Sequence, residues 1–212
     1  MKSHRLVLSL VLLSFSAVAF AQSEAHKMDA PKAAAPKSEA QKSFDTLKTL
    51  AGEWEGPVTT DMSEAMKKQM GGDDMKPLHV TMRVTSRGNT ITHEFQVAGT
   101  LLDATKYDHP VTMIYRDGDQ LNLVHYCDAG NRPHMTAKVS PDGKTFDFDF
   151  VDLSGSNAYG HMVHAVFTVV DGNHHIEEWT YMLPNDIPIH ARFELHRVTG
   201  GIAGTATAGG TQ

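Results

Sequence analysis

The 212-residue chain is poor in cysteine, in clustered basic side chains and in long apolar runs. Its single cysteine, Cys127, has no partner for a disulfide within the chain. Residues 43–199 hold 13 Lys and Arg against 22 Asp and Glu, a difference of −9, and no basic cluster. Binding to nucleic acid relies on such clusters, because the phosphate backbone is recognised through its charge. We therefore expect neither nucleic acid nor an anionic membrane as a partner.

The one extended apolar run lies at the start of the chain. Lys2 and Arg5 precede an apolar stretch at 6–20 that only serines interrupt, and the small residues Ala19 and Ala21 form a cleavage site before Gln22. The stretch is shorter than the roughly 20 residues that a membrane span needs. These features predict a signal peptide at 1–21, export to the periplasm or the outside of the cell, and no membrane span after cleavage.

The segments on either side of the expected domain have little to bury. Residues 22–42 are mostly Ala, Pro, Lys and Ser, and residues 200–212 are mostly Gly, Ala and Thr. Such compositions do not offset the entropy that ordering costs. We therefore predict a disordered linker at 22–42, one domain at 43–199 and a disordered tail at 200–212.

Within that domain the apolar period changes from helical to two. Ser43 is the expected N-cap of a short helix that Gly52 ends, and turn residues separate the segments that follow. The predicted strands are 53–59, 78–86, 89–98, 111–117, 119–127, 132–139, 144–152, 161–170, 173–183 and 187–198. About ten consecutive antiparallel strands favour an all-β, up-and-down β-barrel, since closure removes exposed edges. Whether that barrel is hollow or filled is left open by composition.

A second short helix is expected near 61–70, where Asp61 and Glu64 form a capping pair. Met62, Met66 and Met70 share one face of it, and the methionine-rich region extends to residue 76. Three interpretations remain open: a helix packed on the barrel wall, a lid over a ligand, or a disordered segment.

The sequence at the start of the first strand carries a family signature. Gly52-Glu53-Trp54, after a helix and before a meander of strands, resembles the lipocalin-like (calycin) barrels. In that superfamily an arginine from the last strand covers the tryptophan at the closed end. The resemblance implies that Arg197 covers Trp54, by cation–π attraction and stem packing, and that the pair is structural.

Longer stretches resemble a bacterial family of uncharacterised exported proteins whose expected fold is also lipocalin-like. They are FDTLKTLAGEWEG, DGDQLNLVHYCDAGNRPHM, FDFDFVDLSG, IEEWTYML and FELHR, and the resemblance covers most of 43–198. The barrel is more distantly similar to nitrobindins, which hold haem through a histidine, but no motif carries that ligand onto a numbered position here. The segment 61–76 has no counterpart in the family pattern.

Counting faces along the strands places three histidines inside the barrel: His93, His125 and His161. Buried imidazoles need hydrogen-bond partners. They could hold the polar end of a ligand, bind a metal or haem iron, or bond to one another. Cys127 also counts as inward-facing and is a buried filler, an intermolecular bridge or a functional thiol. The aromatic side chains expected to line a ligand site are Phe95, Phe148 and Phe167.

Catalysis has weaker support, so an enzyme is not the favoured class. A nucleophilic Cys127 needs a lowered thiol pKa, and a nearby Asp128 would raise it. The neighbouring carboxylates Glu177 and Glu178 face opposite sides of a strand. We expect an exported barrel that binds a small apolar or amphipathic molecule. The alternatives are a haem or metal protein that uses His93, His125 or His161, and a filled barrel that binds a protein partner through its surface.

Overall fold

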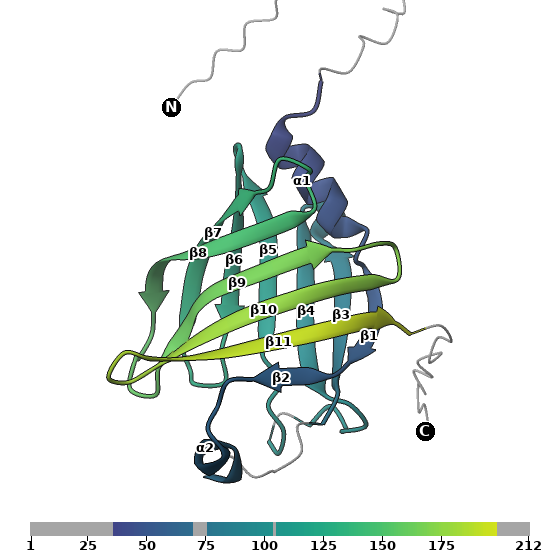
Figure 1. Ribbon diagram of the computed structural model, residues 1–212. Helices are drawn as coiled ribbons and strands as arrows, with labels where there is room; N and C mark the ends of the chain where they lie inside the picture. The colour runs from purple at the N-terminus through teal and green to yellow at the C-terminus, as the bar shows by residue number, and fades with distance from the viewer. Residues whose placement is uncertain (1–35, 70–75, 104, 199–212) are drawn as a thin grey trace, which may run out of the picture. The chain divides into compact units, whose positions relative to one another are not determined.

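The computed structural model describes residues 36–69, 76–103 and 105–198, which form one β-barrel with two short α-helices (Figure 1). The predicted signal peptide, residues 22–35 of the predicted linker and the predicted tail lie outside the described residues, as does Met70. No helix in the described part of the chain combines the length and the apolar character that crossing a bilayer requires.

The strands close into the barrel that the sequence predicts. Their bounds are β1 Gly52–Gly56, β2 Val58–Thr60, β3 Leu78–Thr85, β4 Thr90–Val97, β5 Val111–Asp117, β6 Gln120–Tyr126, β7 Arg132–Val139, β8 Thr145–Ser154, β9 His161–Val169, β10 His174–Leu183 and β11 Ile187–Arg197. All the pairings are antiparallel, from β3 through β11 in sequence order, and β1 joins both β3 and β11. The result is a closed, ten-stranded, up-and-down barrel, in which β2 continues the path of β1.

The first predicted strand is divided at Gly56-Pro57. Pro57 has no N–H to donate to the sheet, and a Cβ at Gly56 would collide with the main-chain carbonyl of Glu194 on β11. The chain therefore approaches β11 closely at this point. It then pairs with β11 a second time as β2.

The N-terminal helix begins earlier than predicted. Helix α1 spans Glu39–Lys48, and its N-cap is Ser38, whose hydroxyl accepts a hydrogen bond from the Gln41 N–H at 3.3 Å. Ser43, the predicted cap, is instead a buried residue inside the helix. The first four residues of α1, 39–42, belong to the segment predicted as linker.

The end of the barrel beside α1 is sealed as the calycin resemblance implies. The Arg197 guanidinium lies 4.1 Å from the centre of the Trp54 ring, and it donates to the carbonyls of Thr49, Ala51 and Gly172 at 2.8–2.9 Å. A Cβ at Gly52, where φ is +145°, would collide with this guanidinium. The Gly-x-Trp pattern is thus explained by packing against Arg197.

The opposite end is built from longer connections. The turns at the α1 end, such as 118–119 and 170–173, are short, whereas the β4–β5 connection at the other end spans residues 98–110. Helix α2, Glu64–Gln69, also lies at this end (Figure 1). Ser63 caps it, with its hydroxyl 3.3 Å from the Met66 N–H, whereas the predicted cap Asp61 accepts a hydrogen bond from His190 N of β11.

Apolar side chains from all round the barrel fill its middle. Phe148 and Phe167 are fully buried there, as is Trp179 to within 1%. They pack with the other members of one cluster, including Val80, Met82, Ile91, Ile114, Leu123, Met135, Phe146, Phe193 and Leu195. The central part of the barrel is therefore filled, a point that composition left open.

Candidate functional site

A buried carboxylate lies at the centre of the barrel's polar residues. Glu177 on β10 is 0% exposed, and its oxygens accept hydrogen bonds from His93 Nε2 (3.0 Å), His175 Nε2 (2.9 Å) and Trp179 Nε1 (3.0 Å). His175, Glu177 and Trp179 alternate along β10 and therefore share its inner face. His93 reaches the same carboxylate from β4, across the interior. We call these four residues the Glu177 network.

The Glu177 network holds its carboxylate ionised. Burial acts to raise the pKa of Glu177, but the charge of His93 and the hydrogen bonds from His175 and His93 outweigh it, so the pKa is lowered. An ionised carboxylate only accepts hydrogen bonds, so each imidazole donates through Nε2. His93 Nδ1 and His175 Nδ1 are buried and have no hydrogen-bond partner among the described residues.

His125 forms a second, separate polar contact inside the barrel. Its Nδ1 lies 2.8 Å from the Thr112 hydroxyl, and the imidazole is almost completely buried. Burial, and then the charge of nearby His93, lower the pKa of His125 from 6.5 to about 3. This imidazole is therefore neutral at physiological pH. It stacks beside Phe95 and lies 5.4 Å from the Trp179 ring, centre to centre.

Aromatic rings occupy the space beside these histidines. Around His93 the ring centres of Phe95, Phe167 and Trp179 lie 5.6–5.8 Å away. A porphyrin needs a flat opening beside its ligating imidazole, and the Phe95 and Trp179 rings fill that space next to both His93 and His125. The residues present inside the barrel thus do not fit a haem.

His161 does not join the other two predicted histidines. A bulge separates the β9–β10 pairs Thr180–His164 and Tyr181–Met162, so Val163 is an extra residue in β9. Met162 therefore packs on the core, and His161 lies half-buried at the end of the strand with Nδ1 2.8 Å from Asn157 Oδ1. His161 is therefore not one of the fully buried histidines, and its ring lies 5.0 Å from that of Phe150 at the end of the barrel away from α1.

Cys127 lies at the first position after β6 and is half-buried. Its sulfur accepts a hydrogen bond from Ala129 N at 3.5 Å, and it forms no hydrogen bond to a histidine in the described part of the chain. Burial raises the thiol pKa, and Asp128 and Asp108 add to the rise. These surroundings are the reverse of those that activate a nucleophilic thiol.

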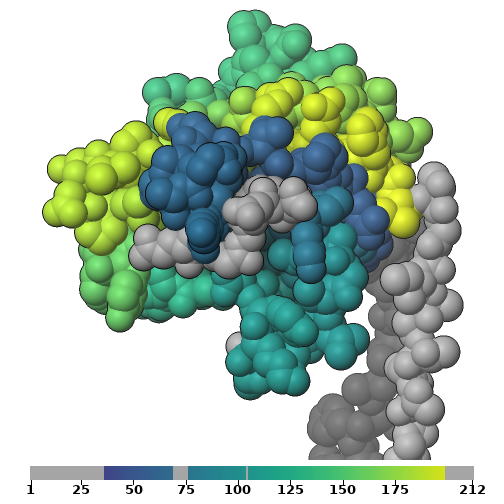
Figure 2. All heavy atoms as spheres, turned by 60° about the horizontal axis from the view of Figure 1, so that its bottom comes forward, coloured from purple at the N-terminus to yellow at the C-terminus, as the bar shows by residue number. Residues whose placement is uncertain are grey.

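Half-exposed apolar side chains gather at the end of the barrel away from α1. Phe95, Phe150, Met162 and Tyr181 continue the inner faces of their strands to this end, and each keeps part of its surface exposed. The most exposed apolar residues of the described chain, Leu101, Leu102 and Tyr159, lie on the connections around them, and Ile187 at the start of β11 is half exposed. Figure 2 looks toward this end, where the connections 98–110 (teal) and 184–186 (yellow-green) project beside α2. We call it the open end.

The outer face carries a different kind of polar contact. His79 lies between Glu53 and Glu55, with ring nitrogens 2.9 and 3.0 Å from their carboxylates, and His109 is 3.3 Å from Glu94. These residues line a hollow of about 310 Å³ on the outside of β1, β3 and β4. A broader hollow lies outside β9, β10 and β11.

The alternation along the strands predicts His93 and His125 inside the barrel, and the structure confirms both positions. It missed His175 and Glu177. The signal was available, because two-residue alternation from the apolar Trp179 puts Glu177 and His175 on the same inner face. Because Glu178 is adjacent to Glu177, the two carboxylates resemble a catalytic pair, whereas Glu177 in fact shares its face with Trp179.

Comparison with known proteins supports the fold and gives no family. No protein-family model matches the chain, and no curated protein matches it either. Among solved structures, Rv2717c of M. tuberculosis superposes with a TM-score of 0.50 at 14% identity, covering 74% of this chain and 98% of that one. At this identity the likeness concerns the fold alone.

Two other solved structures are similar at lower TM-scores. A protein of unknown function from the DUF3598 family of Nostoc punctiforme has a TM-score of 0.37 at 10% identity, covering 72% of this chain and 48% of that one. Bovine odorant-binding protein, in complex with a selenium-containing odorant, has a TM-score of 0.32 at 14% identity, covering 81% and 80%.

Proposed function

We propose that the protein is an exported binding protein that takes a small apolar or amphipathic molecule at the open end of its barrel. The observation that carries this proposal is the gathering of partly exposed aromatic side chains on the inner faces of the strands at that end. The α1 end is closed by Trp54 and Arg197, whereas Phe95, Phe150 and Tyr181 keep exposed surface. Exposed apolar groups that lie together favour a binding surface.

The chemistry of the ligand follows from the residues at this end. Aromatic and thioether side chains there offer an apolar surface, and the Tyr181 hydroxyl donates to the Tyr159 carbonyl at 2.9 Å. Flexible side chains such as Met162 adapt to varied apolar shapes. Cationic residues are missing from this set, so an apolar body with a neutral polar group fits better than a polyanion.

The binding step involves no covalent chemistry. His125 lies just below the open end and is neutral, because its pKa is about 3, so it can accept or donate one hydrogen bond without a charge. The Glu177 network lies deeper and satisfies its carboxylate internally. In this proposal His125 is the polar residue nearest the ligand, and the Glu177 network supports the barrel.

Export is the second part of the proposal and rests on the sequence of residues 1–21. The test is the intact mass of the protein recovered from the periplasm or medium of an expressing bacterium, because an N-terminal glutamine can cyclise and block Edman degradation. We expect a mature chain that begins at Gln22. A full-length chain confined to the cytoplasm would contradict this part.

Binding is tested with two probes of defined chemistry: the fluorescence of 1-aminoanthracene reports its own binding, and dodecan-1-ol is measured by competition against it. The key variant is Phe150→Asp at the open end, where the side chain is 38% exposed. The matched control is Val139→Asp, 37% exposed at the α1 end of β7. We expect about tenfold weaker probe binding for Phe150→Asp, and binding within about twofold of wild type for Val139→Asp. Equal losses in both variants, or no binding by wild type, would rule out the open-end site.

A second candidate function is a filled barrel that binds a protein partner. The filled interior is the observation that favours it, since the aromatic rings around His93 leave no space for a ligand there. The same two variants separate the candidates. A protein partner captured by wild type and lost with Phe150→Asp, without probe binding, would replace the small-molecule proposal.

A further inference from the structure

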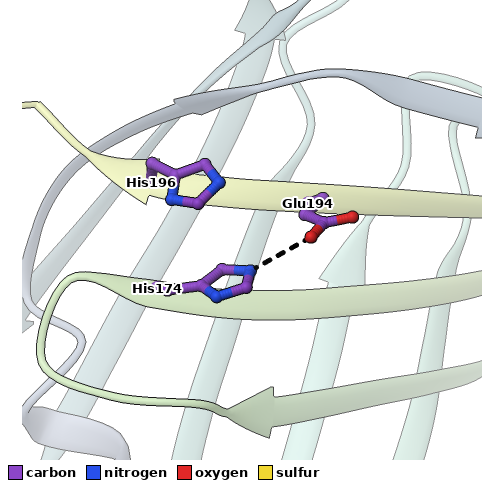
Figure 3. A group of neighbouring side chains, drawn as sticks. All are labelled: His174, Glu194 and His196. Atoms are coloured by element: carbon purple, nitrogen blue, oxygen red, sulfur yellow. Dashed lines mark ion pairs between the residues drawn. The ribbon is translucent and has the colours of Figure 1, made fainter.

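A cluster of metal-ligand type lies on the outer face of the barrel, away from the open end. His174 on β10 pairs directly with His196 on β11, and Glu194 lies two residues before His196 on the same face (Figure 3). The ligand atoms of the three side chains all lie within 4.8 Å of one another. In Figure 3 the two imidazoles stand on neighbouring strands and the Glu194 carboxylate turns toward His174.

We propose that His174, Glu194 and His196 form a binding site for a divalent transition-metal ion, with Zn²⁺ as the reference ion. Two imidazoles and one carboxylate are a recurrent zinc-ligand set in which a water fills the fourth position. The site is independent of the open end and of any ligand bound there. It adds a metal-binding activity to the one proposed above.

The geometry requires only a small movement of the side chains. Metal–ligand bonds of about 2.0–2.2 Å in a tetrahedron place ligand atoms about 3.4 Å apart. His174 Nε2 and Glu194 Oε1 are already 3.4 Å apart. The imidazoles of His174 and His196 stack with centres 4.5 Å apart and an angle of 18° between planes. A rotation about the side-chain bonds of exposed His196 brings its nitrogen to the shared ion.

One ligand atom has an unmet hydrogen-bonding capacity. His174 Nε2 is buried and has no hydrogen-bond partner among the described residues, although the imidazole as a whole is partly exposed. A buried polar atom without a partner costs free energy, and coordination to a metal would satisfy it. The strands hold the two histidines opposite each other through main-chain pairing, so most of the site's geometry is fixed before an ion arrives.

The charges around the cluster favour a cation. Glu55 on β1 pairs directly with His196 and presents its carboxylate on the same outer face, where it bonds to His79 at 3.0 Å. A second cluster, formed by His164, Asp147 and Asp149, has the same kinds of atoms. There, however, Lys138 Nζ already lies 2.6 Å from Asp149, so a cation would have to displace an ammonium group. That second cluster therefore serves as a matched control.

The experiment is calorimetric titration of Zn²⁺ into the untagged full chain at neutral pH. The variants are His174→Gln/His196→Gln together, Glu194→Gln alone, and His164→Gln as the control, and thermal unfolding without metal checks that each is folded. Visible absorption after Co²⁺ loading provides a second readout, because imidazole and carboxylate coordination gives bands that depend on these ligands.

We expect saturable binding of one Zn²⁺ in the wild type, about tenfold or greater weakening in the double variant, and a smaller weakening in Glu194→Gln. Binding by His164→Gln should stay within about twofold of wild type. The Glu194→Gln variant changes an exposed side chain, so it tests the site even if the double variant is unstable. The absence of saturable binding by wild type, unchanged binding by both site variants, or an equal loss in His164→Gln would overturn the proposal.

Discussion

The two faces of β10 use the same residue types for different purposes. On the inner face His175 and Glu177 are fully buried and bond to each other at 2.9 Å. On the outer face Glu178 pairs with Arg192 at 3.1 Å, with both side chains about half exposed, and His174 lies near Glu194. The inner groups are desolvated, and His93 joins them from β4 across the interior, whereas the outer pairs join neighbouring strands in water.

This difference predicts where substitutions will matter. Exposed ion pairs contribute about 0–1 kcal/mol to stability, while breaking a buried pair leaves an uncompensated group that costs about 3–5 kcal/mol. Polar residues inside the barrel should therefore control its stability. Those outside remain free for binding, including the metal site proposed at His174.

Glu177→Gln should have the largest effect. The amide keeps the shape but cannot accept hydrogen bonds from His93, His175 and Trp179 in the same way, so buried N–H groups lose their partner. We expect the free energy of unfolding to fall by about 3–5 kcal/mol, as measured by urea denaturation. The control is the neighbouring Glu178→Gln, which should cost less than about 1 kcal/mol. Similar losses for the two variants would refute the contrast between the faces.

Arg197→Met should have the next largest effect. It removes the guanidinium above Trp54 and three hydrogen bonds to main-chain carbonyls at the closed end. We expect a loss of about 2–4 kcal/mol in the free energy of unfolding, since several charge-assisted hydrogen bonds disappear together.

The matched control for Arg197→Met is Arg192→Met on the outer face, whose pair with Glu178 is exposed. Its cost should stay below about 1 kcal/mol. Probe binding at low temperature should survive Arg197→Met, because the open end lies at the other end of the barrel. Loss of probe binding together with stability would show that the closed end has been assigned wrongly.

Acid should destabilise the protein through its inner face. The pKa of His125 falls from 6.5 to about 3 on folding, so below pH 6.5 the unfolded chain binds a proton that the folded chain does not. The stability due to neutral His125 is thus complete above pH 6.5 and is lost as the pH falls toward 3. Glu177, whose pKa is also lowered, acts with the same sign below its ordinary range near 4.5.

The free energy of unfolding is measured between pH 6.5 and 5, where the titration of His125 contributes more to its pH dependence than that of Glu177. Each proton that the unfolded chain binds and the folded chain does not adds a slope of up to roughly 1.4 kcal/mol per pH unit to the free energy of unfolding. The variant His125→Phe, which keeps a ring but cannot titrate, should have a slope smaller by up to that amount. An unchanged slope would mean that His125 is not held neutral by burial.

The reactivity of Cys127, which lies at the end of β6, should show the smallest of these effects. Burial raises the thiol pKa, so less of the reactive thiolate is present at a given pH. We expect Cys127 to react with iodoacetamide at pH 8 several times more slowly than the same thiol in the urea-unfolded chain. Reaction as fast as, or faster than, that of the unfolded chain would identify Cys127 as an activated thiol.

The strands could be predicted from the sequence because local chemistry specifies them, whereas the closed end was predicted from the resemblance to the calycin barrels. Turn residues such as Asp117-Gly118 and Asp142-Gly143 mark the hairpins, and Gly52-x-Trp54 marks the seal that Arg197 completes. The alternation that places Phe146 and Phe148 inside is equally local. The turns and the alternation need no knowledge of distant contacts, unlike the contact between Trp54 and Arg197.

The remaining features depend on contacts that the sequence does not display. The bulge at Val163 shifts the alternation of β9, so that His161 is not buried with His93 and His125, and no residue nearby signals it. Ser38 and Ser43 are both good N-caps, and in the structure Ser38 caps α1 while Ser43 is buried inside it. The Glu177 network joins residues 84 positions apart, so its existence could not be predicted even where the inner face of β10 could.

The most direct test of the central claim is a native mass spectrum of the exported protein, with an absorption spectrum of the same sample. A filled interior with binding at the open end predicts a colourless protein that carries an organic molecule of roughly a few hundred daltons. A haem-sized mass with a Soret band would contradict the claim. It would require Phe95 and Trp179 to leave their positions beside His93 and His125.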